Sequence, residues 1–175
     1  MPILTGPEPL TPETTIRPAR PGEEDAVLDL LAEAAAWLAG RGIHQWPQRF
    51  PRESVRHQIQ VGEALLIIGR REPIATCVVT EADPELWGVT AESAYYLGRL
   101  AVARKAAGAG PGNRIIDWIG EKAAARGKAF VRVATTRDHP ALRGLYARAG
   151  FEHVADPPAA EWPTSLYQRR AAVGP

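Results

Sequence analysis

The residues with the clearest chemical potential form a glycine-rich segment in the second half of the chain. Every second residue from 108 to 112 is a glycine, in the run Ala107-Gly108-Ala109-Gly110-Pro111-Gly112. A turn of this composition packs closely and can aim several backbone N–H groups at one point, where the dipole of a following helix favours negative charge. The segment predicts a binding site for an anion, most often phosphate. A glycine-rich turn that binds nothing is the alternative.

The spacing of this segment fits neither of the two standard nucleotide loops. A triphosphate-binding loop has Lys-Ser or Lys-Thr after its last glycine, where this chain has Asn113 and Arg114. A dinucleotide fingerprint has two residues between its second and third glycines, where only Pro111 stands. Both standard nucleotide-binding interpretations are therefore weakly supported, and a turn without a ligand stays open.

A second segment downstream carries a tyrosine between a helix start and a glycine. It reads His139-Pro140-Ala141-Leu142-Arg143-Gly144-Leu145-Tyr146-Ala147-Arg148-Ala149-Gly150-Phe151. The two segments resemble those of the GNAT family of acyl-CoA-dependent N-acyltransferases. That family has a Gln/Arg-Gly-x-Gly-x-Gly/Ala loop after its fourth strand and an Asn-Pro-x-Ala-x-x-x-Tyr-x-x-x-Gly-Phe element. The resemblance covers about residues 15–155.

The resemblance implies acetyl-CoA as acyl donor, with its pyrophosphate cradled by the glycine loop and its pantetheine arm paired with a strand end. Two positions depart from the family pattern: Ala107 replaces the usual Gln or Arg, and His139 stands where an Asn is common. A backbone N–H near Ala101 or Val102 is the implied oxyanion donor. The cofactor-binding residues implied by the resemblance are Leu100, Ala101, Val102, Ala107, Gly108, Ala109, Gly110, Gly112, Asn113, Arg114 and His139.

Tyr146 is the predicted catalytic residue. Acyl transfer from a thioester requires a neutral attacking amine, stabilisation of the developing oxyanion and support for the leaving thiolate. A phenol with a pKa near 10 can give a proton to a thiolate, and the family's tyrosine at this position points at the coenzyme sulfur. The alternative is a core aromatic on a helix face.

The general base is not assigned by the sequence. The expected strand at 94–102 contains no carboxylate. Glu81 and Glu92 lie just outside predicted strands, where either could act through water or be a solvated loop charge. We therefore name no base.

The resemblance implies that the acceptor pocket lies between two loops, and in this chain each of them carries a tryptophan. Gln45 and Trp46 lie in the loop between the first two predicted helices, and Trp87 lies in the loop before the strand at 94–102. An indole face and nearby carboxylates suit a cationic amine. A core cap for Trp46 and solvated positions for the acids remain the alternatives. The acids are Glu81, Asp83 and Glu85.

These residues must be positioned by alternating strands and helices. Strand-like runs occupy 15–17, 64–68, 74–80, 94–102, 129–135, 151–154 and 166–170. Apolar residues at helical spacing occupy 27–38, 55–59, 115–123 and 142–149, with helix ends indicated before Gly40 and at Gly62, Gly127 and Gly150. The predicted fold is α/β, a GNAT-like mixed, mainly antiparallel sheet of six or seven strands flanked by about four helices. The resemblance implies that the strands at 94–102 and 129–135 part to admit the pantetheine.

The composition favours a single globular domain. The 175 residues suggest a flexible lead-in at 1–14, one N-acetyltransferase domain at 15–170 and a tail at 171–175. The net charge of +1 gives no reason to expect nucleic acid, and a single cysteine with no paired histidines gives none to expect a metal. No membrane span or secretory signal is recognised, so we expect a cytoplasmic protein.

The predicted function is transfer of an acetyl group from acetyl-CoA to a primary amine of a small molecule, by direct attack in a ternary complex. A protein lysine or N-terminal amine is the first alternative. A non-catalytic acyl-CoA-binding module is the second, since Ala107 and the missing base would suit one. A homodimer is left open, because homodimers are common in folds of this kind.

Overall fold

A mixed sheet of eight strands organises the part of the chain that the computed structural model describes, residues 1–158 and 160–171. The strand order is β1-β2-β3-β4-β5-β6-β8-β7, and all neighbours are antiparallel except β5 and β6. The strands are β1 (Glu8–Thr11), β2 (Thr14–Pro18), β3 (Ala64–Gly69), β4 (Glu72–Thr80), β5 (Ala94–Val102), β6 (Phe130–Thr136), β7 (Glu152–Ala155) and β8 (Thr164–Arg170).

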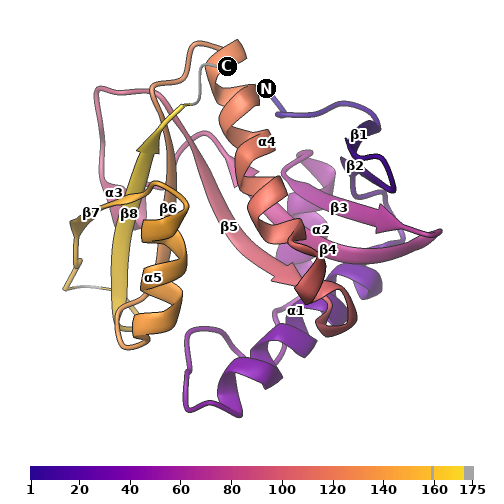
Figure 1. The fold of residues 1–175 in the computed structure, drawn as a ribbon, viewed down its shortest axis with the longest axis horizontal. Helices are drawn as coiled ribbons and strands as arrows, with labels where there is room; N and C mark the ends of the chain where they lie inside the picture. The colour runs from indigo at the N-terminus through magenta and orange to yellow at the C-terminus, as the bar shows by residue number, and fades with distance from the viewer. Residues whose placement is uncertain (159, 172–175) are drawn as a thin grey trace.

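Helices cover both faces of this sheet. One face packs against α1 (Glu24–Ala39) and α2 (Arg52–Gln60), and the other against α4 (Pro111–Ala125) and α5 (Pro140–Arg148), as Figure 1 shows. Two short elements lie in segments expected to be loops: α3 (Pro84–Trp87) and the 3₁₀ segment η1 (Arg104–Ala109). No helix in the described ranges has the length and apolar character needed to span a bilayer.

The apolar runs at the centre of the sheet explain why it forms there. Leu65, Leu66 and Ile67 of β3 are all fully buried, because helices or the N-terminal segment cover successive side chains on both faces. The helix periodicity read from the sequence is confirmed: Val55 of α2 and Ile115 of α4 are also fully buried. Packing on two faces therefore fixes the positions of β4 and β5, which border the site.

The two middle strands separate, as expected from the resemblance. Parallel pairing of β5 with β6 runs from Ala94 opposite Phe130 to Leu97 opposite Val133 and stops there. Past Leu97, β5 pairs with β4 alone, and past Val133, β6 pairs with β8 alone. Figure 1 shows the resulting V-shaped opening between the lower ends of the two strands.

The N-terminal segment corrects two expectations. The lead-in at 1–14 is not flexible: it contributes β1, and Ile3, Leu4 and Leu10 are buried in the core. The sheet consequently has eight strands rather than six or seven. Proline is tolerated in β1 because an edge strand needs ladder hydrogen bonds on one side only. Of the predicted tail at 171–175, residues 172–175 lie outside the described residues.

Candidate active site

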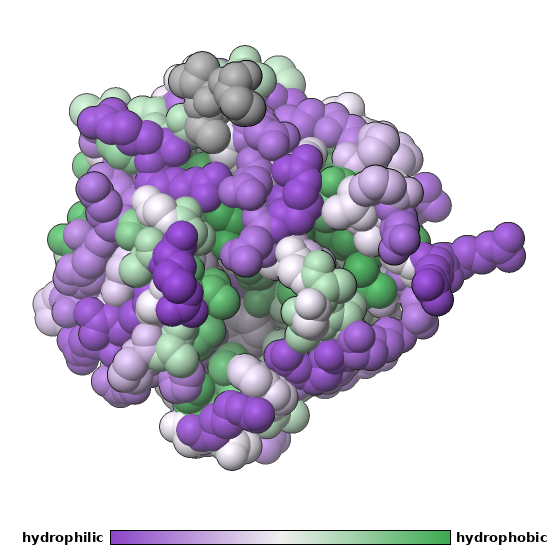
Figure 2. Space-filling view, viewed as in Figure 1, coloured by the Kyte–Doolittle hydropathy of each residue, from purple (hydrophilic) through white to green (hydrophobic). Residues whose placement is uncertain are grey.

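A cleft of about 330 Å³ lies where β5 and β6 part. Its walls come from α1 and the following loop, the separated part of β5, the start of α4, and α5. Figure 2 shows it as a hollow near the centre of this face, with hydrophobic residues on its walls. The structure brings these predicted site residues to it: Gln45, Trp46, Leu100, Ala101, Val102, Ala107, Gly110, Gly112, Asn113 and Tyr146.

The β5 wall combines an open strand edge with a bulge. Beyond Leu97, β6 no longer pairs with β5. The free edge of residues 98–102 therefore presents backbone N–H and C=O groups to the cleft. Thr76 of β4 is opposite Ala101 and Val78 is opposite Gly98, so Arg99 and Leu100 together face a single β4 residue. Arg99 has a φ of 49°, a left-handed conformation that costs a long side chain about 1–2 kcal/mol.

The start of α4 forms the opposite end of the cleft. Gly110 at the N-cap has a φ of 74°, which glycine adopts without strain, and Pro111 begins the helix. No side chain caps this helix and its first turn contains no acidic residue. The first-turn N–H groups of Gly112 and Asn113 therefore remain available, at the positive end of the helix dipole, for an anion such as a diphosphate.

Four predicted cofactor-binding residues do not reach the cleft. Arg114 donates to the Leu10 carbonyl (2.9 Å) and to Glu121 (3.1 Å), which turns its guanidinium toward β1 and along α4. His139 caps α5, with its Nδ1 accepting from the Leu142 N–H at 3.1 Å. The other two, Gly108 and Ala109, are exposed in η1 and do not line the cleft.

Tyr146 lies on the α5 side of the cleft, in an aromatic cluster. Its ring meets Phe151 edge to face at 5.5 Å and stacks with Tyr167 at 6.4 Å between ring centroids. Burial raises the pKa of Tyr146 to about 12, since the protein interior disfavours the phenolate. The hydroxyl therefore keeps its proton at physiological pH and is available as a hydrogen-bond donor.

The opposite wall is built by the loop between α1 and α2. Gln45 accepts a hydrogen bond from the Thr136 N–H through its Oε1 (3.1 Å), which ties this loop to the end of β6. Trp46 packs edge to face on Phe50 at 5.8 Å. The guanidinium carbon of Arg99 lies over the Phe50 ring, 3.9 Å from the ring centre. This side of the cleft is thus aromatic with one cation.

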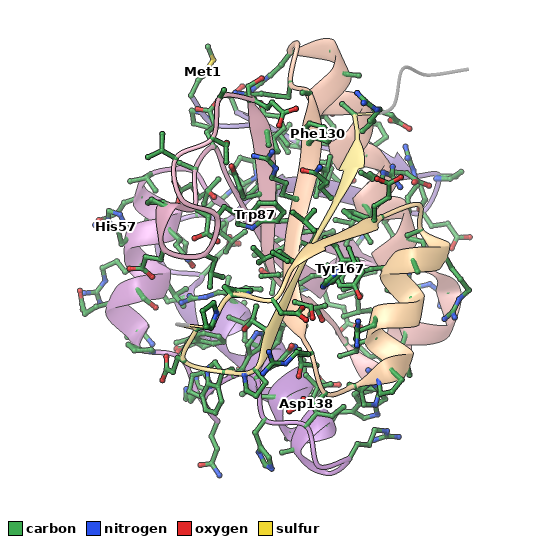
Figure 3. The ribbon with its side chains drawn as sticks, turned by 90° about the vertical axis from the view of Figure 1, so that its left-hand side faces the viewer. Met1, His57, Trp87, Phe130, Asp138 and Tyr167 are labelled. Atoms are coloured by element: carbon green, nitrogen blue, oxygen red, sulfur yellow. The ribbon has the colours of Figure 1, made fainter. Side chains whose placement is uncertain are left out.

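Trp87 does not share this pocket, which corrects the predicted pairing of the two tryptophans. Its ring meets Tyr96 edge to face at 5.9 Å, and the Arg132 guanidinium lies 4.8 Å from its centre. Figure 3 shows Trp87 over the middle of the sheet, well away from Asp138 at the lower end, where α5 begins. The short helix α3 holds Trp87 against the sheet instead of leaving it in a mobile loop.

The acids expected near the acceptor also lie elsewhere. Glu81 binds Lys128 (2.6 Å) and the N-terminal ammonium of Met1 (2.9 Å), and these hydrogen bonds lower its pKa. Glu92 approaches Arg132 at 3.5 Å. Asp83 caps α3 by accepting from the Leu86 N–H, and burial raises its pKa. Met1 lies at the far end of the molecule from Asp138 (Figure 3), so Glu81 is remote from the cleft.

The charged residues lining the described part of the cleft are Arg99 and Arg104, and no carboxylate or histidine joins them. Sequence reasoning missed Arg99 as a site residue and Phe50 as the ring that packs against both Arg99 and Trp46. The available signal was an arginine directly after Gly98 in an otherwise apolar strand, a position that gains meaning only when the strand borders a cavity.

Comparison with protein families and curated proteins gives a consistent result. Residues 34–162 match the family model described as an acetyltransferase (GNAT) domain. The chain is 31% identical over 146 residues to YesJ of Bacillus subtilis, described as an uncharacterized N-acetyltransferase, and the match covers 78% of this chain and 81% of that protein.

Solved structures show the same fold. A GNAT-family acetyltransferase of Listeria monocytogenes superposes with a TM-score of 0.75 at 24% identity, covering 89% of this chain and 93% of that one. N-acetylglutamate synthase of Neisseria gonorrhoeae, solved with coenzyme A and N-acetylglutamate, has a TM-score of 0.64 at 18% identity. That match covers 91% of this chain and 35% of the synthase.

Proposed function

This chain belongs to the GNAT family of acetyltransferases, and from that premise we propose that it transfers an acetyl group from acetyl-CoA to a primary amine of a small molecule. The observation that carries the proposal is the cleft between β5 and β6, with an uncapped helix start at one end and a tyrosine hydroxyl on one wall. Acetyl-CoA supplies the activated acetyl thioester.

The residues of this chain fit that donor. A diphosphate needs N–H donors and an absence of negative charge, and the start of α4 offers Gly112 and Asn113 with no acid in the first turn. A pantetheine arm carries amide groups, which suit the free backbone edge of residues 98–102. Ala107 lines the cleft without a polar side chain, so we assign the phosphate grip to backbone groups.

Tyr146 would stabilise the departing thiolate. With a pKa of about 12, the phenol holds its proton more tightly than a thiol, whose pKa is about 8.5. Complete transfer of the proton to the sulfur is therefore unfavourable, whereas a hydrogen bond from the hydroxyl to the sulfur is not. We assign Tyr146 this hydrogen bond, and a backbone N–H near Ala101 or Val102 the developing charge on the acetyl oxygen.

The amine would attack directly. The C–N bond forms as the C–S bond breaks, and the proton lost by the amine balances the proton that ends on the coenzyme thiol. Since no carboxylate or histidine lines the described part of the cleft, we assign no general base to the protein. The guanidiniums of Arg99 and Arg104 favour the neutral form of a nearby amine, which is the form that attacks.

A small acceptor suits the size of the cleft. Its volume of about 330 Å³ is at the lower end of the range for small-molecule sites and must also hold the thioester end of the donor. The loop carrying Trp46 closes one side through the Gln45 hydrogen bond to β6. A protein lysine or N-terminus, the second acceptor class, would need a shallower and longer groove.

Release of coenzyme A thiol, measured over a panel of amines, peptides and proteins, tests the proposal. We expect turnover with at least one small amine and little with lysine-containing peptides. If coenzyme A raises the melting temperature but no acceptor yields thiol, the chain is a non-catalytic acyl-CoA-binding module. Turnover with protein substrates alone would show that the acceptor is a protein lysine or N-terminal amine.

A further inference from the structure

Arg99 is a cation in the acceptor side of the cleft that has only neutral partners among the described residues. Its Nη1 donates to Gln58 Oε1 at 2.9 Å and to Ser54 Oγ at 3.3 Å, both on α2. The Phe50 ring supports the guanidinium plane from 3.9 Å. These three contacts hold the group in place without neutralising it.

Two donors of Arg99 are not used by the described residues. Its Nε and Nη2 have no hydrogen-bond partner in the described part of the chain, and every buried side-chain nitrogen or oxygen there has one. These two groups are therefore accessible, and Arg99 lines the cleft. The Nε–Nη2 edge of a guanidinium is a fork that matches the two oxygens of a carboxylate.

The other enclosed arginines of this protein are satisfied within the fold. Arg17 pairs with Glu23 at 2.7 Å, and Arg132 bonds to Gln168, Tyr96 and Thr90 with Glu92 nearby. Burial lowers the pKa of Arg99, which means that its surroundings disfavour the charge they enclose. An incoming anion would relieve that cost.

The backbone also holds Arg99 in this position at some cost. Its left-handed conformation lies in the β5 bulge, directly beside the point where β6 leaves. Bulges of this kind redirect a side chain next to an active site, and strained conformations persist where the surrounding structure enforces them. Here the bulge brings the side chain to α2 and the aromatic pair of Trp46 and Phe50.

We propose that the acceptor is an amino carboxylate, an amino acid or close relative, whose carboxylate is bound by Arg99 beside the Trp46–Phe50 pair. This inference rests on the proposed function and narrows its acceptor class. The carboxylate completes the Nε–Nη2 fork, the apolar part of the acceptor packs on the aromatic pair, and the amine is left on the side of the cleft nearer Tyr146. A plain amine or an amide would leave Arg99 unpaired.

The experiment compares α-, β- and γ-amino acids with their carboxamides, using thiol release with saturating acetyl-CoA. We expect the wild-type protein to prefer the acid of at least one pair by about 10- to 100-fold in kcat/KM, the range for a hydrogen-bonded charge pair. Arg99→Gln should remove that preference by raising KM for the acid, so that the acid and its amide are used about equally. The matched control is Arg56→Gln, which removes an arginine of α2 that pairs with Glu53 outside the cleft.

A second variant and a binding readout keep the test decisive. Arg99→Gly removes the side chain and relaxes the left-handed backbone, so it serves if Arg99→Gln folds poorly. Thermal shift of the coenzyme A complex should show stabilisation by the preferred acid, none by its amide, and none in either Arg99 variant. Amides used as well as acids, or acids and amides affected alike by both variants, would overturn the inference.

Thiol release and binding also separate the two proposals. If no amine releases thiol but an amino acid binds through Arg99, the transferase proposal fails and the carboxylate site stands. If amines lacking a carboxylate are acetylated well, the transferase proposal stands and the carboxylate site fails. If no member of the panel reacts or binds, both fail.

Discussion

The two halves of the cleft differ in the groups that form them: one is formed mainly by backbone groups and the other by side chains. The half assigned to the cofactor uses backbone: the free edge of β5 and the first turn of α4, which begins after Gly110. The half assigned to the acceptor uses side chains: Trp46 in a loop and Arg99 in a bulge, with Arg99 held from behind by Gln58 on α2. Backbone sites depend on local geometry and tolerate substitution, whereas side-chain sites depend on identity.

The largest expected effect tests the backbone half. Gly112→Asp places a negative charge in the first turn of α4, where it favours the helix but repels a phosphate. We expect coenzyme A to bind on the order of 100-fold more weakly, from repulsion between charges about 6 Å apart at an effective dielectric of about 20. Calorimetric titration with coenzyme A measures the loss.

The control for that change is Gly112→Ala. A Cβ at this position would meet only Val102 Cγ2, at 4.0 Å, so the added methyl group fits. Binding close to wild type is expected. Equal loss in both variants would show that space, and not charge, governs the cradle.

The next largest effect is expected at Tyr146, which lies between the two halves of the cleft. Tyr146→Phe keeps the ring contacts with Phe151 and Tyr167 but removes the hydroxyl. We expect kcat to fall about 100-fold, the range for loss of one hydrogen bond to a charge that develops in the transition state, and coenzyme A affinity to stay the same. Unchanged turnover would restrict Tyr146 to packing.

The pH profile tests whether the acceptor half contains a base. With no carboxylate or histidine lining the described cleft, kcat/KM for the acceptor should rise about tenfold per pH unit up to the pKa of the acceptor amine. Tyr146, with a pKa of about 12, stays protonated throughout and should cause no decline below about pH 11. A plateau beginning near pH 6 or 7 with every acceptor would instead reveal a protein base.

Substitution of the two tryptophans distinguishes a residue of the acceptor site from a residue that stabilises the fold. Trp46→Ala should raise the acceptor KM about fivefold, since an aromatic contact contributes about 1 kcal/mol, and should leave cofactor binding unchanged. Trp87→Ala removes the contacts with Tyr96 and Arg132 and should lower stability by about 2 kcal/mol without a specific effect on KM. Steady-state kinetics and denaturant unfolding distinguish these outcomes, and the reverse pattern would exchange the two roles.

The smallest expected effect concerns Cys77, which is fully buried in β4. Burial raises the pKa of this thiol to about 12, so almost none of it is thiolate at neutral pH. Cys77→Ala should therefore keep turnover within about twofold and cost about 1 kcal/mol of stability. Loss of turnover, or an acetylated cysteine in mass spectra, would contradict direct attack by the amine.

Local pattern in the sequence was enough for the helices and for the backbone half of the cleft. Helix spacing predicted the buried faces of α2 and α4, and alternating glycines before α4 predicted an anion-binding turn. The spacing of Tyr146 within its segment predicted a side chain on one face of α5. The helix faces and the turn depend on residues within a few positions of one another, so the sequence alone determines their local geometry, whereas anion binding at the turn stays a prediction.

The side-chain half was decided by contacts between residues far apart in the chain. Arg99 bonds to residues 41 and 45 positions away, and an edge strand of the N-terminal segment pairs with β2 while its apolar residues enter the core. Trp46 and Trp87 lie in similar loops in the sequence, and only packing assigns one to the cleft and the other to the sheet. The function of such a side chain depends on which distant residues lie beside it in the folded chain, and a local sequence pattern does not contain that information.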